Sequence, residues 1–245
     1  MDAKVSRLLI NGFIKKNKIN MDEYENVKYL SFNDFFSREV RKECRFSSEN
    51  INDLISPCDG KLTVYKINSD SVFQIKNSLY NIDSLLQDKT LAGEYINGVC
   101  LIFRLTPDDY HRYCYIDNGE ILAIKKINGV LHTVRPIALQ HYNIYKMNSR
   151  ECTIMKTDNF GKVIQIEVGA LFVGRIKNKA ASGFFNRKGE KGLFEFGGST
   201  VILLFQNNKI IIDDIIYSNT MNDKETIVKM GCKIGEISNI KEKKL

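Results

Sequence analysis

The chain has 245 residues, of which 43% are hydrophobic and 27% are charged. This balance is typical of a globular protein with a sizeable core and excludes a disordered chain. No apolar run reaches the roughly 18 to 20 residues of a membrane-spanning helix, and the first residues lack the apolar region of a signal peptide, so we expect a protein that stays in the cytoplasm. No Pro-, Gly- or Ser-rich linker divides the chain, which predicts a single domain over residues 1–245.

The formal net charge is +7, from 36 basic and 29 acidic residues. This excess suits an anionic partner, either a nucleic acid or an acidic membrane surface. The basic residues are interspersed with acids and no nucleic-acid-binding signature accompanies them, so we predict no nucleic-acid partner. The six cysteines form no Cys-x-x-Cys pair and have no histidine at ligand spacing, which argues against a disulfide framework and against a metal site.

Residues 1–50 are expected to form a helical lead. Between Ala3 and Lys18, apolar residues recur at helical spacing among lysines and arginines, which predicts a basic amphipathic helix. Its apolar stripe could lie on an anionic bilayer or pack on the protein core, and both alternatives stay open. A second helical segment is predicted near residues 21–29, and Ser31 is expected to cap a short helix that carries three phenylalanines.

From Ile55 onward, short β-branched or aromatic runs alternate with Gly, Asn and Asp. Strands are expected at residues 61–67, 72–75, 98–105, 120–127, 153–157, 163–168, 171–176, 192–196, 200–205 and 209–212. Residues 81–86 are expected to form a short helix among them. The pattern predicts an α+β, mainly β fold, in which the short N-terminal helical segment precedes a mainly antiparallel β domain at residues 55–245.

A glycine pair directly before Ser199 lies between a Phe-rich strand and a Val/Ile/Leu strand. Glycine leaves the backbone free to adopt conformations closed to other residues. The Ser199 hydroxyl could therefore attack the Gly198 carbonyl and convert the peptide bond into an ester, provided that a base removes its proton. β-Elimination would then leave dehydroalanine, which hydrolyses to a pyruvoyl group. The same residues also fit an ordinary hairpin turn, so the motif alone does not decide.

Three polar stretches resemble site loops. Asp59 follows a proline in a turn that precedes a strand. His111 lies in a loop rich in acids and tyrosines, and His132 lies in a segment bounded by Gly and Pro. Because histidine gains and loses its proton near neutral pH, His111 and His132 are the natural bases, although buried histidines are often purely structural. His141 lies in a plainer, helix-like context.

Together these stretches resemble one family. The motifs Phe-Phe-x-Arg, Ser-Pro-x-Asp-Gly, Pro-x-Asp-Tyr-His-Arg, Asn-Phe-Gly, Val-Gly-Ala-x-x-Val-Gly-x-Ile and Lys-Gly-x-Phe-x-Phe-Gly-Gly-Ser-Thr occur here in that order, beginning at Phe35, Ser56, Pro107, Asn159, Val168 and Lys191. Their order closely resembles that in phosphatidylserine decarboxylases. The resemblance covers about residues 32–235.

The resemblance implies a proenzyme that cuts itself between Gly198 and Ser199, giving a β chain of residues 1–198 and an α chain of residues 199–245 that begins with a pyruvoyl group. The pyruvoyl carbonyl would form a Schiff base with phosphatidylserine and take up the electrons released with CO₂, leaving phosphatidylethanolamine. Neither a metal nor PLP is then needed. The protein would act peripherally at the cytoplasmic face of the cell membrane, and a homodimer stays open.

The family performs cleavage with an Asp-His-Ser triad, whose outer members Asp59 and Ser199 match. The triad histidine is replaced here by Cys114, which could act as a base only as a thiolate, with an ordinary pKa near 8.5. The base is therefore His132 reaching the same space, Cys114, or His111 acting in both steps. The family role of His111 is to protonate the carbanion carbon or to position the carboxylate.

Two other functions stay open at this point. One is a pyruvoyl-dependent decarboxylase of another serine phospholipid or of a soluble amino acid. The other is an uncleaved relative that binds anionic lipid or protein partners without catalysis. Self-cleavage separates this last alternative from the two enzymes, because only the enzymes would yield two fragments.

Overall fold

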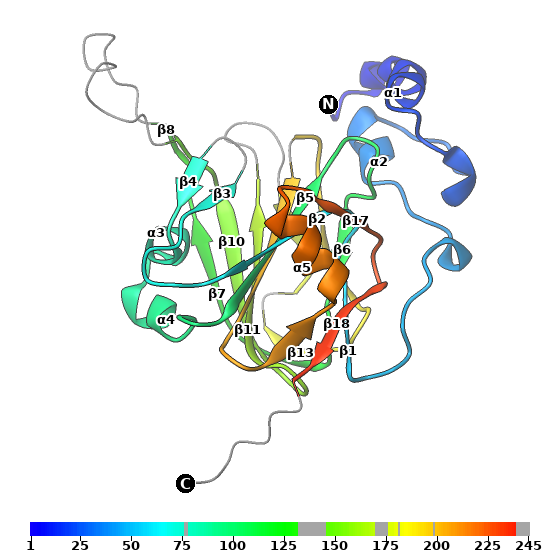
Figure 1. The fold of residues 1–245 in the computed structure, drawn as a ribbon. Coiled ribbons are helices and arrows are strands. Elements are labelled where there is room, and N and C mark those ends of the chain that lie inside the picture. Colours follow the sequence, from blue (N-terminus) through cyan, green and yellow to red (C-terminus); the bar gives the residue numbers. More distant parts are fainter. Residues whose placement is uncertain (76–77, 132–145, 170–175, 181, 198, 239–245) are drawn as a thin grey trace, which may run out of the picture.

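Antiparallel strands behind a short helical lead make up most of the protein (Figure 1), which confirms the expected α+β, mainly β class. The computed structural model describes residues 1–75, 78–131, 146–169, 176–180, 182–197 and 199–238. The described α-helices are α1 (Ile10–Asn17), α2 (Phe32–Phe36), α3 (Ile82–Leu86), α4 (Lys89–Gly93) and α5 (Asp214–Met221). Short 3₁₀ helices cover Lys4–Leu9, Met21–Glu23 and Lys42–Cys44.

The main sheet is antiparallel. Its strands, in spatial order, are β13 (Gly183–Phe185), β7 (Gly119–Ile127), β10 (Arg150–Thr157), β11 (Gly161–Val168), β15 (Ser199–Phe205), β5 (Val99–Leu105), β2 (Gly60–Lys66) and β17 (Thr226–Val228). Every residue of β15 is buried, as expected for a continuous apolar run in an interior strand.

Smaller sheets surround the main one. They are β12 (Ile176–Asn178) with β14 (Glu190–Phe194) and β6 (Arg112–Cys114), β1 (Asp53–Ile55) with β18 (Lys233–Ile237) and β16 (Ile210–Ile212), and the pairs β3 (Phe73–Ile75) with β4 (Ser78–Tyr80) and β8 (Val130–Leu131) with β9 (Lys146–Met147).

Hydrophobic clusters cover both faces of the main sheet. Because successive side chains of a strand point to opposite faces, Val201 and Leu203 of β15 join one cluster while Ile202 and Leu204 join the other. The first cluster includes Phe194 and other residues of the sheet formed by β12, β14 and β6. The second includes buried side chains of α3 and α4. Strand β15 therefore lies at the centre of the core.

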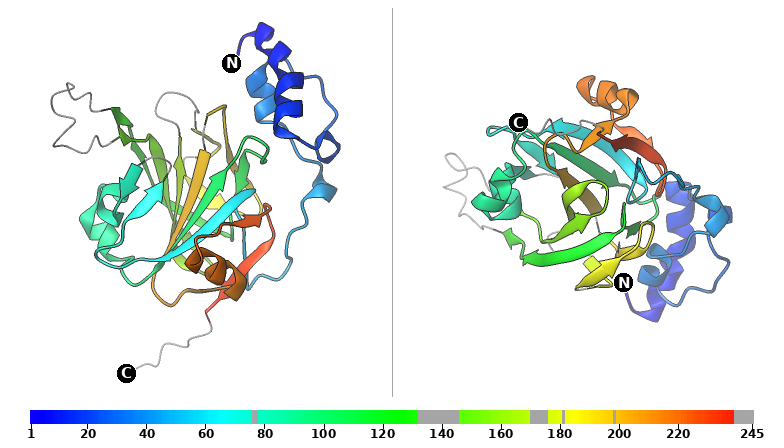
Figure 2. Two further views of the ribbon diagram at one scale, coloured as in Figure 1. Left: turned by 45° about the horizontal axis from the view of Figure 1, so that its top comes forward. Right: turned by 90° about the horizontal axis from the view of Figure 1, so that it is seen from below.

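The helical lead packs through a third cluster, here called the lead cluster. Its buried members are Ile10, Ile19, Tyr24, Phe32, Phe35, Phe36 and Tyr110, with Phe13, Phe196 and Met230 among the residues packed against it. In Figures 1 and 2 the lead lies on one side of the sheets and α3 and α4 lie on the opposite side. Leu8 is 76% exposed, so the first helical segment packs one face inward and leaves another in solvent.

The helical predictions for the lead are confirmed at both ends and wrong between them. Residues 4–17 are helical, and the Ser31 hydroxyl caps α2 by accepting from the Asp34 amide at 3.2 Å. Between residues 21 and 29 only Met21–Glu23 is helical. The chain then becomes extended, because Tyr24 bridges Val40 and the Glu25 amide donates to the Glu39 carbonyl.

Most of the expected strands are present, and the predicted short helix is α3. The predicted strand over residues 171–176 falls almost entirely outside the described residues. Helix α5 was not expected from the sequence.

Candidate active site

Ser199 is the first residue of the central strand β15. It pairs with Leu105 at the end of β5, and only 2% of its surface is exposed. Its Oγ donates to the Gly197 carbonyl oxygen at 3.0 Å. Gly197 has a φ of 145°, a conformation that favours glycine. Gly198 lies outside the described residues.

The segment that leads into Ser199 is held from two directions. Its strand, β14, ends at Phe194, whose amide donates to the His111 carbonyl at 2.9 Å. Two residues later, the Phe196 amide donates to Asn33 Oδ1 at 3.2 Å, and the Phe196 ring lies 5.0 Å from the Phe32 ring. The chain before the proposed cleavage bond thus contacts both the His111 loop and the helical lead.

His111 is buried, with its ring 3.9 Å from the ring of Phe36. Its Nδ1 lies 2.9 Å from the Asp109 carbonyl oxygen. Because a carbonyl only accepts, Nδ1 carries the hydrogen and Nε2 keeps the lone pair. Burial, assisted by the positive charge of Arg38, lowers the pKa of His111 to about 3. His111 is therefore neutral at pH 7, with Nε2 as its acceptor atom.

Asp59 is fully buried beside cations. Arg45 binds both of its carboxylate oxygens, through Nε at 3.0 Å and Nη2 at 2.7 Å. Lys229 Nζ donates to Oδ2 at 3.0 Å, and the Met230 amide donates to Oδ1 at 2.9 Å. These four donors engage both oxygens, and they join the Asp59 turn to the lead and to the C-terminal part of the chain. Within the described residues, Asp59 is thus held by cations and an amide.

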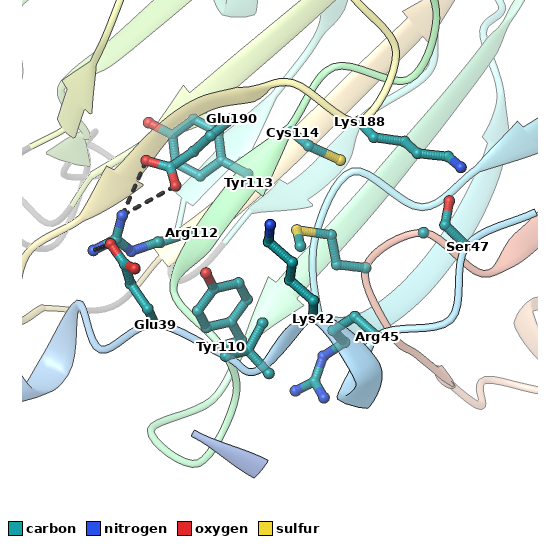
Figure 3. A pocket seen from close by; sticks show the side chains of 13 residues that line it. Glu39, Lys42, Arg45, Ser47, Tyr110, Arg112, Tyr113, Cys114, Lys188 and Glu190 are labelled. Atoms are coloured by element: carbon teal, nitrogen blue, oxygen red, sulfur yellow. Dashed lines mark hydrogen bonds and ion pairs between the residues drawn. The ribbon is translucent and has the colours of Figure 1, made fainter. Parts of the chain in front are cut away.

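Cys114 lies on β6 in a pocket of about 530 Å³. The pocket is lined by Glu39, Val40, Lys42, Arg45, Ser47, Tyr110, Arg112, Tyr113, Cys114, Lys188, Glu190, Met230 and Gly231. In Figure 3 the ion pair of Arg112 and Glu190 lies on one side of the pocket and Lys188 on the other. Burial raises the pKa of the Cys114 thiol to about 12, so the thiol is protonated at pH 7 and is a poor base.

A buried polar network lies on the same face of the main sheet as Ser199, and sequence reasoning missed it. Lys191 on β14 and Glu167 on β11 form an ion pair of 2.7 Å, with side chains 1% and 0% exposed. Asn178 donates to Glu167 at 3.0 Å and to Glu151 at 2.6 Å. Glu167 pairs with Val201, two residues beyond Ser199 along β15. A glutamate in the apolar run of residues 163–168 was the available signal.

The predicted site residues are therefore only partly brought together. His111 and Ser199 both border the segment of residues 194–199, and Asp59 is close enough to affect the pKa of His111 electrostatically. Cys114 is located in the pocket, whose lining does not include Ser199. His132, the predicted base, and His141 lie outside the described residues.

None of the helices within the described residues is long and apolar enough to cross a membrane. The same residues contain no group of three or more His, Cys, Asp and Glu side chains that could hold a metal ion.

Known proteins resemble most of this chain. A family model described as phosphatidylserine decarboxylase matches residues 32–236. Phosphatidylserine decarboxylase proenzyme 2 of Clostridium acetobutylicum is 52% identical over 230 residues, which cover 94% of this chain and 79% of that protein. The phosphatidylserine decarboxylase proenzyme of Ruminiclostridium cellulolyticum is 42% identical over 239 residues, covering 96% and 80%. The phosphatidylserine decarboxylase proenzyme of Clostridium tetani is 42% identical over 242 residues, which cover 96% of this chain and 81% of that protein.

Proposed function

The chain belongs to the phosphatidylserine decarboxylase family, and from this premise we propose that it is a self-cleaving proenzyme that converts phosphatidylserine to phosphatidylethanolamine and CO₂. The observation that carries the proposal is the placement of Ser199. Its hydroxyl is buried at the start of the central strand, directly after a glycine-rich turn, and hydrogen-bonds to the backbone of that turn.

Cleavage begins when Ser199 loses its proton and its Oγ bonds to the Gly198 carbonyl carbon. The C–N bond breaks, so that an ester joins the two residues and the Ser199 nitrogen becomes a free amine. β-Elimination then removes the Cα hydrogen of residue 199 and breaks its Cβ–Oγ bond, which leaves Gly198 as a carboxylate and residue 199 as dehydroalanine. The dehydroalanine tautomerises to an imine, and water replaces its nitrogen, which leaves as ammonia. Ser199 thereby becomes the pyruvoyl group at the start of an α chain of residues 199–245, and Gly198 ends a β chain of residues 1–198.

The base for this step is His132, His111 or Cys114. The raised pKa of the Cys114 thiol argues against Cys114. His111 offers a neutral imidazole with a lone pair on Nε2, and it borders the cleavage segment. The proposed triad of Asp59, His132 and Ser199 requires that His132 approach an aspartate already bound by Arg45 and Lys229.

The two chains would remain one folded unit after cleavage. Strand β15 starts at Ser199 and stays paired with β11 on one side and with β5 on the other, and both of these neighbours belong to the β chain. Strands β17 and β18 of the α chain likewise pair with β2 and β1. We therefore treat residues 1–245 as a single domain.

The pyruvoyl group supplies a carbonyl that binds the substrate amine and accepts the electrons released with CO₂, so no metal and no PLP is required. The remaining tasks fall to the side chains. Because neutral His111 has its lone pair on Nε2, it must first accept a proton before it can donate one to the carbon that loses CO₂. Its buried position beside Phe36 keeps that proton away from bulk water.

The helical lead offers a surface for an anionic membrane, which would make the enzyme peripheral at the cytoplasmic face. Val5, Leu8 and Leu9 are exposed apolar side chains in a segment that also carries Lys4 and Arg7. Apolar side chains insert among lipids, and each basic residue near an anionic surface adds on the order of 1 kcal/mol.

The test is the chain pattern of the purified protein. The wild type should run as fragments of residues 1–198 and 199–245, with the smaller fragment blocked at its N-terminus, and should release CO₂ from phosphatidylserine. Ser199→Ala should remain one inactive chain. A wild-type protein that stays intact and inactive, or a Ser199→Ala protein that still splits at this bond, would overturn the proposal.

Three further variants assign the base. If His132 is the base, His132→Ala leaves an uncut chain, whereas Cys114→Ala still cleaves. His111→Ala should then cleave but fail to release CO₂. Normal maturation of His132→Ala would remove His132 from the triad.

A further inference from the structure

The end of helix α2 contacts the loop that carries His111. The Phe36 ring lies 3.9 Å from the His111 ring. Two residues later, Arg38 Nη2 donates to the carbonyl oxygens of Asp108 and Asp109, both at 3.3 Å. The Asp109 carbonyl is also the acceptor for His111 Nδ1. One carbonyl thus joins the lead to the proposed catalytic histidine.

We propose that Arg38 is a positioning residue for His111: it holds the Asp109 carbonyl that receives the Nδ1 hydrogen, and thereby keeps the Nε2 lone pair directed to the reaction. The inference rests on the proposed function, in which His111 accepts and returns a proton. It assigns to the lead a role in the chemistry, separate from membrane contact.

The contacts of Arg38 leave it little freedom. Its side chain is among the largest that are almost fully buried, at 2% exposure. The guanidinium carbon lies 4.2 Å from the centre of the Tyr24 ring and 5.0 Å from that of Phe35. Nη2 also donates to the Tyr24 hydroxyl at 3.1 Å. A planar cation packed against two aromatic rings has its donors oriented by those contacts.

Two donors on one carbonyl determine the state of the imidazole. A carbonyl oxygen has two lone pairs, and here Arg38 Nη2 and His111 Nδ1 each use one. Reversing the tautomer would place the Nδ1 lone pair against the carbonyl oxygen, leaving two buried acceptors without a hydrogen between them. The anchored carbonyl therefore favours the tautomer with the hydrogen on Nδ1.

The charges around His111 act in opposite senses. The Arg38 cation lowers the pKa of His111, whereas Asp59 and Asp108 favour its protonated form. Asp59 is neutralised by Arg45 and Lys229. The Asp109 carboxylate is engaged by the amide and hydroxyl of Thr106 and by Lys61.

Strand β14 contacts the His111 loop through the Phe194 amide, and Glu195, the next residue along the chain, is paired with Lys177. Of the charges that act on the pKa of His111, that of Arg38 opposes protonation. Its removal should make His111 easier to protonate.

The experiment reads His111 directly by NMR of protein labelled with ¹⁵N-histidine, in a Ser199→Ala background that does not depend on catalysis. The chain has three histidines, so variants can assign their signals. We expect the tautomer with the hydrogen on Nδ1 in the parent protein. In Arg38→Met, the pKa of His111 should rise by about 1 unit or more, the effect of removing one nearby like charge, and the tautomers should mix.

Two further variants distinguish the hydrogen-bond geometry of Arg38 from its charge and from a general effect of altering the helical lead. Arg38→Lys keeps the charge but loses the planar guanidinium, so the tautomers should mix while the pKa stays closer to that of the parent. Arg41→Met is the matched control, because Arg41 donates to the Tyr24 carbonyl and, within the described residues, makes no hydrogen bond or ion pair with the His111 loop. It should leave both properties of His111 unchanged.

In catalytically competent protein, the acid limb of kcat/KM for phosphatidylserine should move to higher pH in Arg38→Met. A folded Arg38→Met protein with an unchanged tautomer and pKa of His111 would overturn the inference, even if the enzyme is active. If Arg38→Met does not fold, an Arg38→Lys protein with the parent tautomer would overturn it as well. Absence of decarboxylation in the wild type would instead count against the proposed function.

Discussion

Lys191→Met should be the most destabilising substitution of a charged residue in the buried network. Lys191 Nζ lies 2.7 Å from Glu167 Oε2, and both side chains are at most 1% exposed. Without the ammonium group, Glu167 keeps its hydrogen bond from Asn178 in the protein interior. Removing one partner of a buried pair costs about 3–5 kcal/mol, because the remaining charge is left uncompensated. That is a large share of the roughly 5–15 kcal/mol by which native proteins are stable.

The assay is thermal unfolding followed by circular dichroism in a Ser199→Ala background, so that every variant has the same chain pattern. For a chain of this length, 1 kcal/mol moves Tm by about 2–4 °C, so Lys191→Met should lower Tm by about 6–20 °C. A matched exposed pair serves as the control. Lys162 and Glu94 are also 2.7 Å apart but partly exposed, so Lys162→Met should cost no more than about 1 kcal/mol.

A double variant separates lost charge from lost packing. Glu167→Leu with Lys191→Met replaces both charges by apolar groups, which is often neutral or stabilising for a buried pair. The double variant should therefore unfold at a higher temperature than Lys191→Met alone. If Lys191→Met costs no more than Lys162→Met, or if the double variant is as unstable as the single one, the reasoning about an uncompensated carboxylate is wrong.

Two further predictions concern the lead and pH. Replacing the exposed Leu8 and Leu9 by Gln should weaken binding to anionic vesicles in a sedimentation assay without slowing self-cleavage. Phe13→Ala should instead slow self-cleavage, because the ring centres of Phe13 and Phe196 are 6.1 Å apart. The opposite pattern would contradict the assignment of membrane contact to Leu8 and Leu9 and of packing on the cleavage segment to Phe13.

In urea titrations, His111 should contribute a fall in the free energy of unfolding of about 1.4 kcal/mol per pH unit as pH decreases from 6.5 towards 3, because its lowered pKa makes the unfolded chain bind the extra proton. In His111→Asn, the free energy of unfolding should depend less steeply on pH. An unchanged pH dependence would contradict its assignment to the lowered pKa of His111.

Local signals allowed the central strand and the lead helices to be predicted from sequence. The apolar run after Ser199 has the length and composition of a buried strand, and its position in the main sheet confirms that prediction. The Ser31 cap was equally local, since a serine needs only the amide three residues later. Helix α5 escaped because its apolar residues make no clear stripe: Ile215 is exposed while Ile216 is buried.

The surroundings of the site could not be predicted because they depend on contacts between distant residues. Asp59 was readable as a turn aspartate, but its partners Arg45 and Lys229 lie 14 and 170 positions away along the chain. The Lys191–Glu167 pair joins strands of two different sheets. Hydrophobic periodicity and turn residues predict each strand separately, and they do not predict how one sheet packs on another.

The contacts on either side of the proposed cleavage bond explain why self-cleavage should follow folding. Phe196 is held by aromatic rings of the lead, which begins the chain, whereas Ser199 is held by β5 within the main sheet. Both sets of contacts join residues far apart in the sequence. The position of the Ser199 hydroxyl relative to residue 198 is therefore determined only when both sets are formed. An unfolded or half-folded chain samples many conformations of the glycine turn, and few of them bring the hydroxyl to a carbonyl. The glycines before Ser199 leave the backbone free to adopt the conformation that cleavage needs, and for the same reason that conformation has to be selected by the surrounding fold.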